Sequence, residues 1–540
     1  MKFLPYRFID FASLIEGGFE YVDKTYYVHQ LLRSPGQYFL ARPHKFGKSL
    51  LLEALEAALR GRRELFKGLW LAGTDYDWRP SPVITLDLAH LRIDDLKSFN
   101  KSLLNQLKAV AETEELSIDA PEPNQFFQSL IEGLYQKSAQ TPVATLIDNY
   151  DSRFFIEWYR DKTTWREIRQ GLVSFLNVLN LTERYRGLTL IVGQTRLTAS
   201  SNYPGARNLV DLTLDPRYAN CCGFTLEEFD SVFAERLERE LDEFKACGEM
   251  DPAASPADLR DKILAWHDGY SWDGRSRLLN PSALIKLFTS QSFDDHGVDN
   301  IEFSMLDQFL KKNKTLYLRC FTRNNYIDPG ANEIDPQAFR LEPLLFQIGV
   351  LTCRTDGPPM DSKFNLVFPN LEIKWSLAAK LLSLSLPQVD PLILRTQARA
   401  VLTSLFQKNP GKFSEALTLF LSHYEFDPQS PVDSFLARIF VMAATLADQP
   451  LEPESAVRGQ RLDLRLRDPE SGEVLFLDFN GLTEGVNQKP LPLKALTRLN
   501  QRIARLKNPV GQNRLTTIIV LVDSAGQVTA NFAESSSPAP

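Results

Sequence analysis

The chain has 540 residues and a net charge of −7, with 44% hydrophobic and 24% charged residues. A single core rarely exceeds roughly 250–300 residues, so this ordinary globular composition predicts two or three domains. The negative net charge excludes a polycation that coats nucleic acid along its whole length. Five cysteines without a Cys-x₂-Cys pair, and six scattered histidines, argue against a disulfide framework and a structural zinc site.

The N-terminus, Met1-Lys-Phe-Leu-Pro-Tyr-Arg7, lacks the apolar stretch of a signal peptide. The sequence also contains no run of about 18 apolar residues that could cross a membrane. We therefore expect a cytoplasmic protein that makes no use of a membrane.

In the first 245 residues, short apolar runs alternate with helical patterns. Strands are expected at 38–41, 83–88, 143–148 and 188–192, and helices at 49–59, 97–114, 124–138 and 162–180. Strands that alternate with helices are typical of an α/β domain with a parallel sheet and right-handed crossovers.

The first strand leads into a segment with the pattern of a phosphate-binding loop, Arg42-Pro43-His44-Lys45-Phe46-Gly47-Lys48-Ser49, with Leu50 next on the helix. Backbone amides of such a P-loop surround the phosphate oxygens of ATP or another nucleoside triphosphate. Lys48 would contact the β- and γ-phosphates, and the Ser49 hydroxyl would bind Mg²⁺. Arg42 stands where the usual motif has its first glycine, so a chance Gly-Lys-Ser at a helix N-cap is the alternative.

The strand at 143–148 ends in Asp148, which would hold Mg²⁺ at the carboxyl edge of the sheet. An ordinary turn residue is the alternative. Asn149 follows, and an amide can orient a water molecule but cannot accept its proton. Asp151 is a candidate substitute for the missing base. We therefore expect nucleotide binding with slow or absent turnover, and Gln194 or Thr195 as candidates for contact with the γ-phosphate.

The remaining chain changes in character. Residues 251–256 indicate a linker or a loop, 257–385 a mostly helical region with loops near 268–280 and 325–337, and 391–447 further helices. The last part favours α/β structure, with a hairpin of 462–466 and 474–479, a helix at 494–506 and a strand at 516–522. The expected domains are 1–245, 246–388 and 389–532, followed by a disordered tail at 533–540.

Several motifs follow one another in a fixed order: Tyr21-Val-Asp-Lys-Thr25, the loop 42–49, Glu64-Leu-Phe-Lys-Gly-Leu69, Leu146-Ile-Asp-Asn-Tyr-Asp151, Leu214-Asp-Pro-Arg-Tyr218, Cys222-Gly-Phe-Thr225, His267-Asp-Gly-Tyr270 and Asn280-Pro281. In these motifs the chain resembles bacterial AAA-ATPase-like proteins that carry a C-terminal PD-(D/E)XK nuclease-like domain. The resemblance implies an AAA-like NTPase module, a helical middle region and a restriction-endonuclease-like α/β domain. It also accounts for Arg-Pro in place of the first loop glycine. The family usually has Asp-Glu-Tyr-Asp where this chain has Asp148-Asn-Tyr-Asp151, which again indicates impaired hydrolysis.

A PD-(D/E)XK site uses two carboxylates to hold Mg²⁺ at the scissile phosphate, and a lysine to position water. The resemblance places Asp463 and Asp478 as the two carboxylates and Asn480 where the lysine belongs. An impaired nuclease or a non-catalytic nucleic-acid-binding domain would result, unless Lys489 or Lys494 supplies the charge. Two solvated aspartates on a hairpin are the alternative.

Residues 489–514 contain seven basic and no acidic residues. Lys494, Arg498, Arg502 and Arg505 would give a helix one basic face that could follow a DNA or RNA backbone, and a solvated helix face is the alternative. AAA-like modules often complete their site with an arginine from a neighbouring subunit, so a homo-oligomer is compatible with the resemblance. The candidate arginines are Arg196, Arg207 and Arg217. A nucleotide-gated binding or scaffold protein without turnover is the rival to an enzyme.

Overall fold

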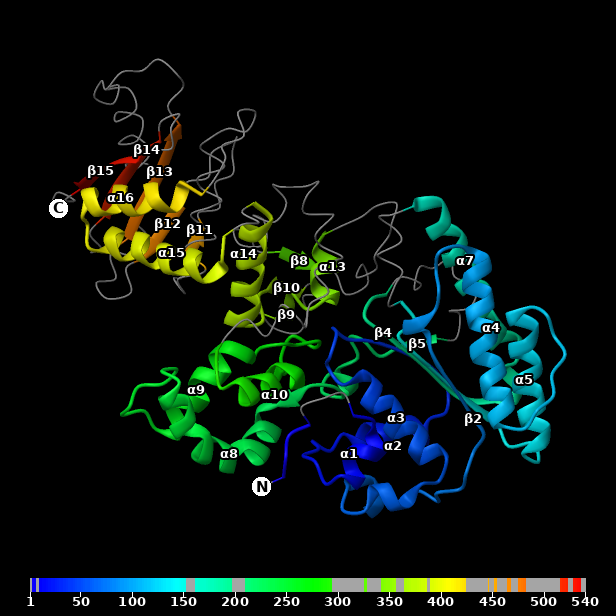
Figure 1. Cartoon of the computed structure of the whole chain (residues 1–540). Coiled ribbons are helices and arrows are strands. Elements are labelled where there is room, and N and C mark those ends of the chain that lie inside the picture. The colour runs from blue at the N-terminus through cyan, green and yellow to red at the C-terminus, as the bar shows by residue number, and fades with distance from the viewer. Residues whose placement is uncertain are drawn as a thin grey trace. The chain divides into compact units, whose positions relative to one another are not determined.

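Figure 1 shows the computed structural model of the chain. The structure describes residues 2–5, 9–151, 161–196, 209–293, 325–327, 341–355, 364–385, 389–423, 445, 451–453, 464–467, 474–481, 515–522 and 528–535. The chain divides into two compact units, Met1–Lys312 with Asn324–Ile373, and Asn313–Arg323 with Lys374–Pro540. The boundaries of the three domains expected from the sequence remain a prediction.

The first unit is built on a five-stranded sheet with the order β2-β3-β4-β1-β5. Its strands are β1 (Gln37–Ala41), β2 (Val83–Asp87), β3 (Val143–Asp148), β4 (Arg186–Gly193) and β5 (Leu209–Asp211). All neighbours pair in parallel, so the predicted parallel α/β domain is confirmed. The sequence predicts four of these strands, and the edge strand β5 is an addition to them.

Helices cover both faces of this sheet. The chain runs from β1 to the edge strand β2 and then returns through β3 and β4, so right-handed crossovers place the connecting helices on opposite faces. Figure 1 shows one group on each side. The first group is α1 (Phe11–Glu16), α2 (Thr25–Arg33) and α3 (Lys48–Leu59), and the second is α4 (Leu96–Thr113), α5 (Pro123–Lys137) and α7 (Lys162–Leu181). The expected helices are confirmed within a few residues.

Three helices follow the sheet: α8 (Leu226–Ala246), α9 (Pro256–His267) and α10 (Pro281–Ser290). Capping boxes at Thr225 with Glu228 and at Ser255 with Asp258 fix the starts of α8 and α9. Their shared core is rich in aromatic side chains, including Phe229, Phe233, Phe244, Trp266 and Phe288.

The region expected to be mostly helical also contains short strands. β6 (Phe224–Thr225) pairs with β7 (Leu278–Leu279), and β8 (Asn325–Ile327), β10 (Phe364–Val367) and β9 (Thr352–Arg354) form a sheet in that order. The expected loops at 268–280 and 325–337 are therefore wrong where β7 and β8 lie. Strands of two to four residues are too short for hydrophobic periodicity to reveal. The helix α13 (Leu341–Gln347) lies between β8 and β9 in the chain.

The second unit contains most of α14 (Leu371–Ser385), then α15 (Pro391–Phe406), α16 (Pro410–Leu421) and a five-stranded sheet. The sheet has the order β11 (Leu451–Pro453), β12 (Leu464–Arg467), β13 (Val474–Gly481), β14 (Leu515–Val522) and β15 (Val528–Ser535). β13 and β14 are parallel, and the other pairs are antiparallel. The predicted hairpin of β12 and β13 is confirmed.

The prediction of a disordered tail at 533–540 is wrong for 533–535, which belong to β15 and pair with β14. Residues 536–540 and the expected helix at 494–506 lie outside the described residues. In the part of the chain that the structure describes, no helix combines the length and apolar character needed to cross a bilayer.

Candidate functional site

The loop between β1 and α3 has the geometry of an anion cradle. Gly47 adopts a left-handed conformation with φ of 97° and turns the chain into α3, a conformation that glycine takes at no steric cost. The backbone amides of Gly47, Lys48 and Ser49 donate to no other described residue. Unpaired amides at the start of a helix are a ready site for an anion.

Lys48 is buried with its ammonium at the mouth of this loop. Its Nζ donates to the carbonyl oxygens of Arg42, at 3.0 Å, and Pro43, at 2.9 Å. An ammonium carries three N–H donors, so one remains for a ligand. Burial lowers the pKa of Lys48, and the neighbouring carboxylate of Asp148 opposes this shift. Desolvation and the charges of Lys48 and Lys45 lower the pKa of His44 to about 4, so His44 is neutral at pH 7.

Asp148 ends β3 and lies beside the loop. Its carboxylate accepts hydrogen bonds from the Ser49 hydroxyl and from the backbone amide of Asn149, the latter at 2.8 Å. Desolvation raises the pKa of Asp148, and the Ser49 hydrogen bond and Lys48 partly offset it. A hydroxyl and a carboxylate in contact are hard oxygen ligands that suit Mg²⁺. Within the described ranges, no three His, Cys, Asp or Glu side chains form a cluster that could hold a metal ion.

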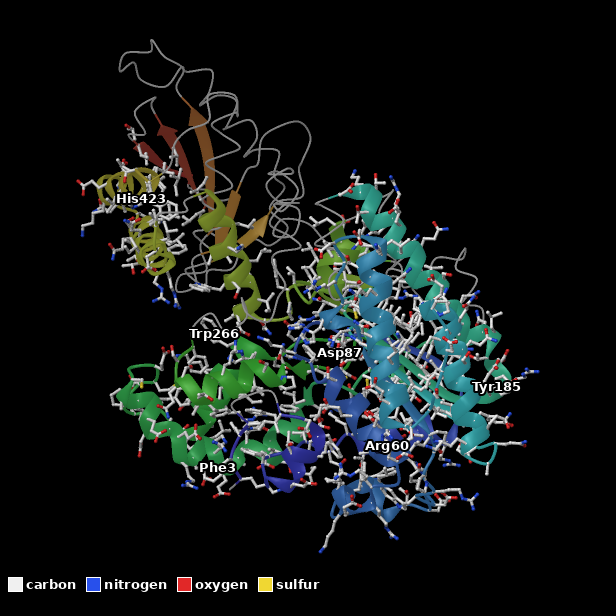
Figure 2. The ribbon with its side chains drawn as sticks, turned by 45° about the vertical axis from the view of Figure 1, so that its right-hand side comes forward. Phe3, Arg60, Asp87, Tyr185, Trp266 and His423 are labelled. Atoms are coloured by element: carbon white, nitrogen blue, oxygen red, sulfur yellow. The ribbon has the colours of Figure 1, made fainter. Side chains whose placement is uncertain are left out.

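Asn149 contacts a carboxylate that the sequence analysis overlooked. Its Nδ2 donates to Oδ1 of Asp87, the last residue of β2, at 2.9 Å. Asp87 and Asp148 are register partners on adjacent parallel strands, so both lie at the carboxyl edge of the sheet. Figure 2 labels Asp87 on this part of the molecule. The available signal was that the strand at 83–88 contains an aspartate near its end, like the strand at 143–148.

Asp151 is buried and bonded to the loop after β4. Its carboxylate accepts hydrogen bonds from the backbone amides of Gln194, at 3.0 Å, and Thr195, at 2.6 Å, and from the Thr195 hydroxyl. Gly193 allows this approach, because a Cβ there would lie 2.6 Å from the Asp151 Oδ1 and 2.3 Å from the Tyr150 ring. These contacts favour a structural role for Asp151, and its role as a base remains a prediction.

The Arg42 side chain lies in the protein interior with 1% of its surface exposed. Its guanidinium donates to the carbonyl oxygens of Ala41 at 2.8 Å, Thr213 at 2.9 Å and Tyr218 at 2.9 Å. It also lies 4.4 Å from the ring centre of Trp272. The guanidinium is thus committed to protein groups, and Arg42 would affect a ligand through the shape of the loop.

Phe46 anchors the loop on its inner side. Its ring contacts those of Tyr270 and Trp272, with centroids 4.9 and 5.0 Å away. Its carbonyl accepts a hydrogen bond from the Gly223 amide at 3.1 Å. At Gly349 a Cβ would lie 2.9 Å from the Pro43 ring, so that turn also packs closely on the loop. Several parts of the chain therefore pack against the loop and fix its shape.

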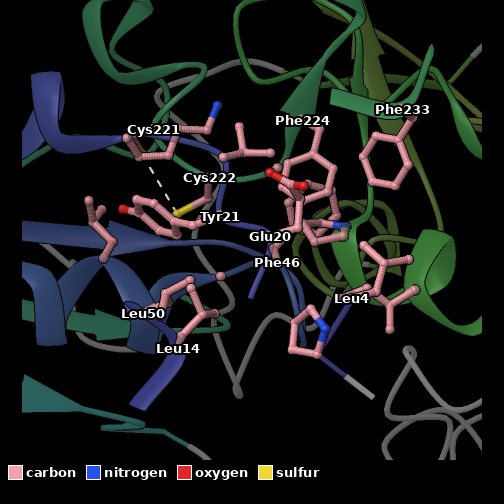
Figure 3. Close-up of a pocket in the computed structure, with 18 residues that line it drawn as sticks. Leu4, Leu14, Glu20, Tyr21, Phe46, Leu50, Cys221, Cys222, Phe224 and Phe233 are labelled. Carbon is pink, nitrogen blue, oxygen red and sulfur yellow. Dashed lines mark hydrogen bonds between the residues drawn. The ribbon is translucent and has the colours of Figure 1, made fainter. Parts of the chain in front are cut away.

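A cavity of about 100 Å³ adjoins the loop at Gly47 and Leu50 (Figure 3). Its wall is largely apolar and includes Leu4, Tyr21 and Phe224. Cys221 and Cys222 also line it, with their sulfur atoms 3.9 Å apart. A flat apolar group attached to a phosphate in the loop could enter this space.

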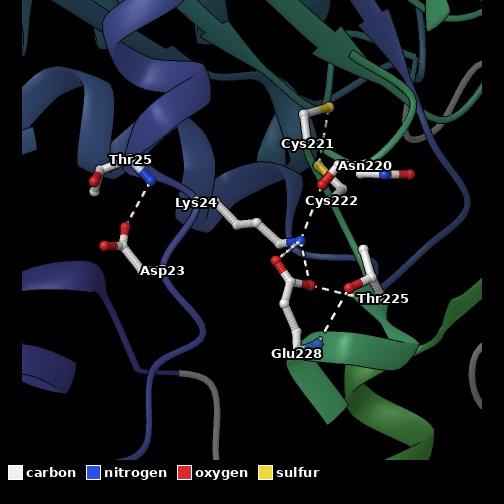
Figure 4. A network of polar contacts seen from close by, with 8 residues as sticks. All are labelled: Asp23, Lys24, Thr25, Asn220, Cys221, Cys222, Thr225 and Glu228. Carbon is white, nitrogen blue, oxygen red and sulfur yellow. Dashed lines mark hydrogen bonds and ion pairs between the residues drawn. The ribbon is translucent and has the colours of Figure 1, made fainter. Parts of the chain in front are cut away.

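Within the motif Tyr21-Val-Asp-Lys-Thr25, the side chains of Asp23 and Lys24 make polar contacts that connect distant segments of the chain (Figure 4). Lys24 Nζ is 2.7 Å from both carboxylate oxygens of Glu228 and donates to the Asn220 carbonyl at 3.0 Å. Asp23 accepts hydrogen bonds from the amides of Thr25, at 2.8 Å, and Trp70, at 2.6 Å. These contacts bind the N-terminal segment to the start of α8 and to the turn near Trp70.

Two candidate arginines for a neighbouring subunit have acidic partners in their own chain. Arg196 lies 2.5 Å from Asp211, and Arg217 lies 2.6 Å from Asp215. Arg207 lies outside the described residues. The homo-oligomer remains a prediction.

In the second unit, Asp478 and Asn480 lie two residues apart on β13 and pair with Ile519 and Leu521 of β14. The other candidates for the second metal site and the basic helix lie outside the described residues, namely Asp463, Lys489, Lys494, Arg498, Arg502 and Arg505. The structure thus brings Lys48, Ser49 and Asp148 together, engages the side chains of Arg42 and Asp151 with other protein groups, and leaves the residues of the second site untested.

Comparisons with known proteins find one family model and one relative. A model of the family described as "Predicted AAA-ATPase" matches residues 5–201, a segment that includes the loop, Asp87 and β3. Over 489 residues, the chain is 27% identical to "Uncharacterized protein in vnfD 5'region" from Azotobacter chroococcum mcd 1, covering 88% of this chain and 89% of that protein. Residues 5–201 are therefore similar to the family of predicted AAA-ATPases.

Proposed function

We propose that the N-terminal part binds a nucleoside triphosphate with Mg²⁺ and hydrolyses it slowly. The observation that carries this proposal is that the amides of Gly47, Lys48 and Ser49 donate to no described residue and lie beside the contact between Ser49 and Asp148. Phosphate oxygens need donors at the start of a helix, and a Mg²⁺-bound phosphate needs oxygen ligands beside them. The AAA-ATPase-like match over residues 5–201 supports the same function.

Each residue has a distinct task in this proposal. The loop amides and the remaining N–H of Lys48 bind the β- and γ-phosphates. Bound Mg²⁺ would neutralise phosphate charge and would be held by the Ser49 hydroxyl, directly, and Asp148, through water. The cavity beside Leu50 supports binding of the base, because its apolar wall suits a flat heterocycle. ATP is the first nucleotide to test.

Nucleotide binding is tested by titrating a fluorescent ATP analogue, with and without Mg²⁺, into the full chain. Lys48→Ala should weaken binding by at least about 10-fold, because a charge-assisted phosphate contact is lost. Lys67→Ala changes an exposed lysine and serves as the matched control. Thermal unfolding of both variants separates loss of binding from loss of fold. Equal affinity in wild type and Lys48→Ala would contradict the proposal.

We also propose that the second unit is a degenerate nuclease-like domain that binds nucleic acid. Its strand connections support this: an antiparallel pair β12–β13 is followed by β14, parallel to β13. Asp463 directly precedes Leu464, whose partner Leu477 is directly followed by Asp478. Asn480 would leave this site without its usual cation.

Two measurements test the second unit. Neutralising Lys494, Arg498 and Arg502 together should weaken retention of DNA or RNA and flatten its salt dependence, because fewer counterions are released on binding. Asn480→Lys should raise Mg²⁺-dependent cleavage of DNA or RNA above the wild-type level. If wild type retains neither DNA nor RNA at any salt concentration, the proposed nucleic-acid role is wrong.

A nucleotide-gated binding protein without turnover is the second candidate. Asn149 favours it, because an amide cannot accept the proton of an attacking water. Tight binding of ATP without release of phosphate would support this candidate over a slow NTPase.

A further inference from the structure

We infer that Asp87 is the general base for nucleotide hydrolysis, with Asn149 as the residue that positions it. The inference rests on the proposed NTPase function and names the group that would activate the water. The observation behind it is the hydrogen bond between the Asn149 Nδ2 and the Asp87 Oδ1, 2.9 Å long. Only the NH₂ group of an amide can donate to a carboxylate, so the contact fixes the orientation of the Asn149 side chain.

The other carboxylates at this edge of the sheet are occupied. Asp148 accepts from Ser49 and the Asn149 amide, which commits it to the metal side of the site. Asp151 is 1% exposed and accepts hydrogen bonds from Gln194 and Thr195. Asp87 differs because it is exposed to solvent.

The local structure holds Asp87 in one orientation. Its Oδ1 accepts from the Ala89 amide, at 2.9 Å, as well as from Asn149. Its backbone carbonyl accepts from Gln106 Nε2 of α4, at 2.7 Å. Oδ2 accepts no hydrogen bond from a described residue, which leaves it available for the proton of a water molecule.

Position also favours this residue. Asp87 and Asp148 are register partners on neighbouring strands, which lie about 5 Å apart. In the reaction, the water oxygen bonds to the γ-phosphorus while one water proton passes to Asp87. The bond from the γ-phosphorus to the β–γ bridging oxygen breaks, and its electron pair stays on the departing nucleoside diphosphate. Asp87 then releases the proton to solvent.

Steady-state phosphate release and nucleotide binding, measured on the full chain, test the assignment. Asp87→Asn keeps the size of the side chain and an oxygen acceptor, so folding should be retained and thermal unfolding checks this. Turnover should fall by about 100-fold or more, while nucleotide affinity changes by less than about threefold. Asp94→Asn, at an exposed aspartate in the same connection, is the matched control and should keep the wild-type rate.

The exchange variant Asp87→Asn/Asn149→Asp returns a carboxylate to the same pair. It should recover at least about 10-fold of the turnover lost in Asp87→Asn, because a base again faces the site. An Asp87→Asn rate within threefold of Asp94→Asn would overturn the inference. Wild type that binds nucleotide without turnover would overturn it as well. Absence of nucleotide binding in wild type would instead refute the proposed function itself.

Discussion

Replacing Arg42 with glycine distinguishes two explanations of the phosphate loop. The substitution recreates the usual motif, in which four residues separate the first glycine from Gly-Lys-Ser, here Gly47-Lys48-Ser49. If the loop needed its first glycine, nucleotide affinity would rise. The structure predicts that nucleotide affinity falls. The Arg42 guanidinium holds the start of the loop in place through its contacts with three carbonyl oxygens and Trp272.

The size of the effect follows from those contacts. A buried acceptor left without its partner costs about 1–3 kcal/mol. The carbonyls of Ala41 and Thr213 would lose the guanidinium as a donor, whereas the Tyr218 carbonyl would keep the Cys221 amide, and the contact with Trp272 would also be lost. Water entering the vacated space and relief of charge burial offset part of this sum. We expect a net loss of about 2–4 kcal/mol for Arg42→Gly, or a fall in Tm of about 3–5 °C.

The assay combines thermal unfolding with titration of MgATP. Arg42→Gly should lower both the Tm and the nucleotide affinity. Arg42→Lys should fall between it and wild type, because an ammonium cannot reproduce the planar fork of donors. Arg79→Gly, at an exposed loop position, controls for the loss of a charge and the gain of a glycine. A Tm for Arg42→Gly within 1 °C of wild type, with tighter binding, would refute this account.

Two further substitutions test the surroundings of the loop. Gly223→Ala should destabilise the protein by about 1–3 kcal/mol more than Gly68→Ala, as measured by Tm. Both positions have similar positive φ, at 82° and 84°, but only at Gly223 would a Cβ lie 2.7 Å from the Phe46 ring; equal effects would contradict the packing argument. Glu53→Gln should reduce the loss of stability between pH 5 and pH 8 by about 1–2 kcal/mol, after allowance for partial exposure. Burial raises the pKa of Glu53 from 4.5 to about 7, so the folded state binds its proton more tightly and stability falls as the pH rises through that range. Glutamine can still accept the hydrogen bond from the Phe11 amide. The free energy of unfolding is measured with denaturant at the two pH values, and an equal change with pH in wild type and Glu53→Gln would contradict the prediction.

The sequence predicts the main sheet well because its buried strands are long enough to show as apolar runs. β5, β8 and β9 have only three residues each, so no periodicity marks them. β15 contains Asn531 and Glu534, which disfavour strands, and its pairing with β14 overrides that local preference.

The candidate site shows the same limit at the level of side chains. Lys48, Ser49 and Asp148 follow from motif spacing, because the strands and helix that carry them are local features. The motif alone assigned Arg42 to the nucleotide, although its side chain bonds with residues more than 170 positions later in the chain. Asp87 escaped notice for a related reason, since its contact with Asn149 depends on the register of two parallel strands.

The shared guanidinium of Arg42 has a consequence for motion. Any movement that draws Thr213 and Tyr218 away from the end of β1 must separate the buried Arg42 cation from these two hydrogen-bond partners. Such a separation costs free energy, so residues 213–218 must move together with the start of the phosphate loop as one rigid body. Insertions or deletions within residues 213–218 would then change the shape of the phosphate loop at Arg42, although they lie far from it in the sequence.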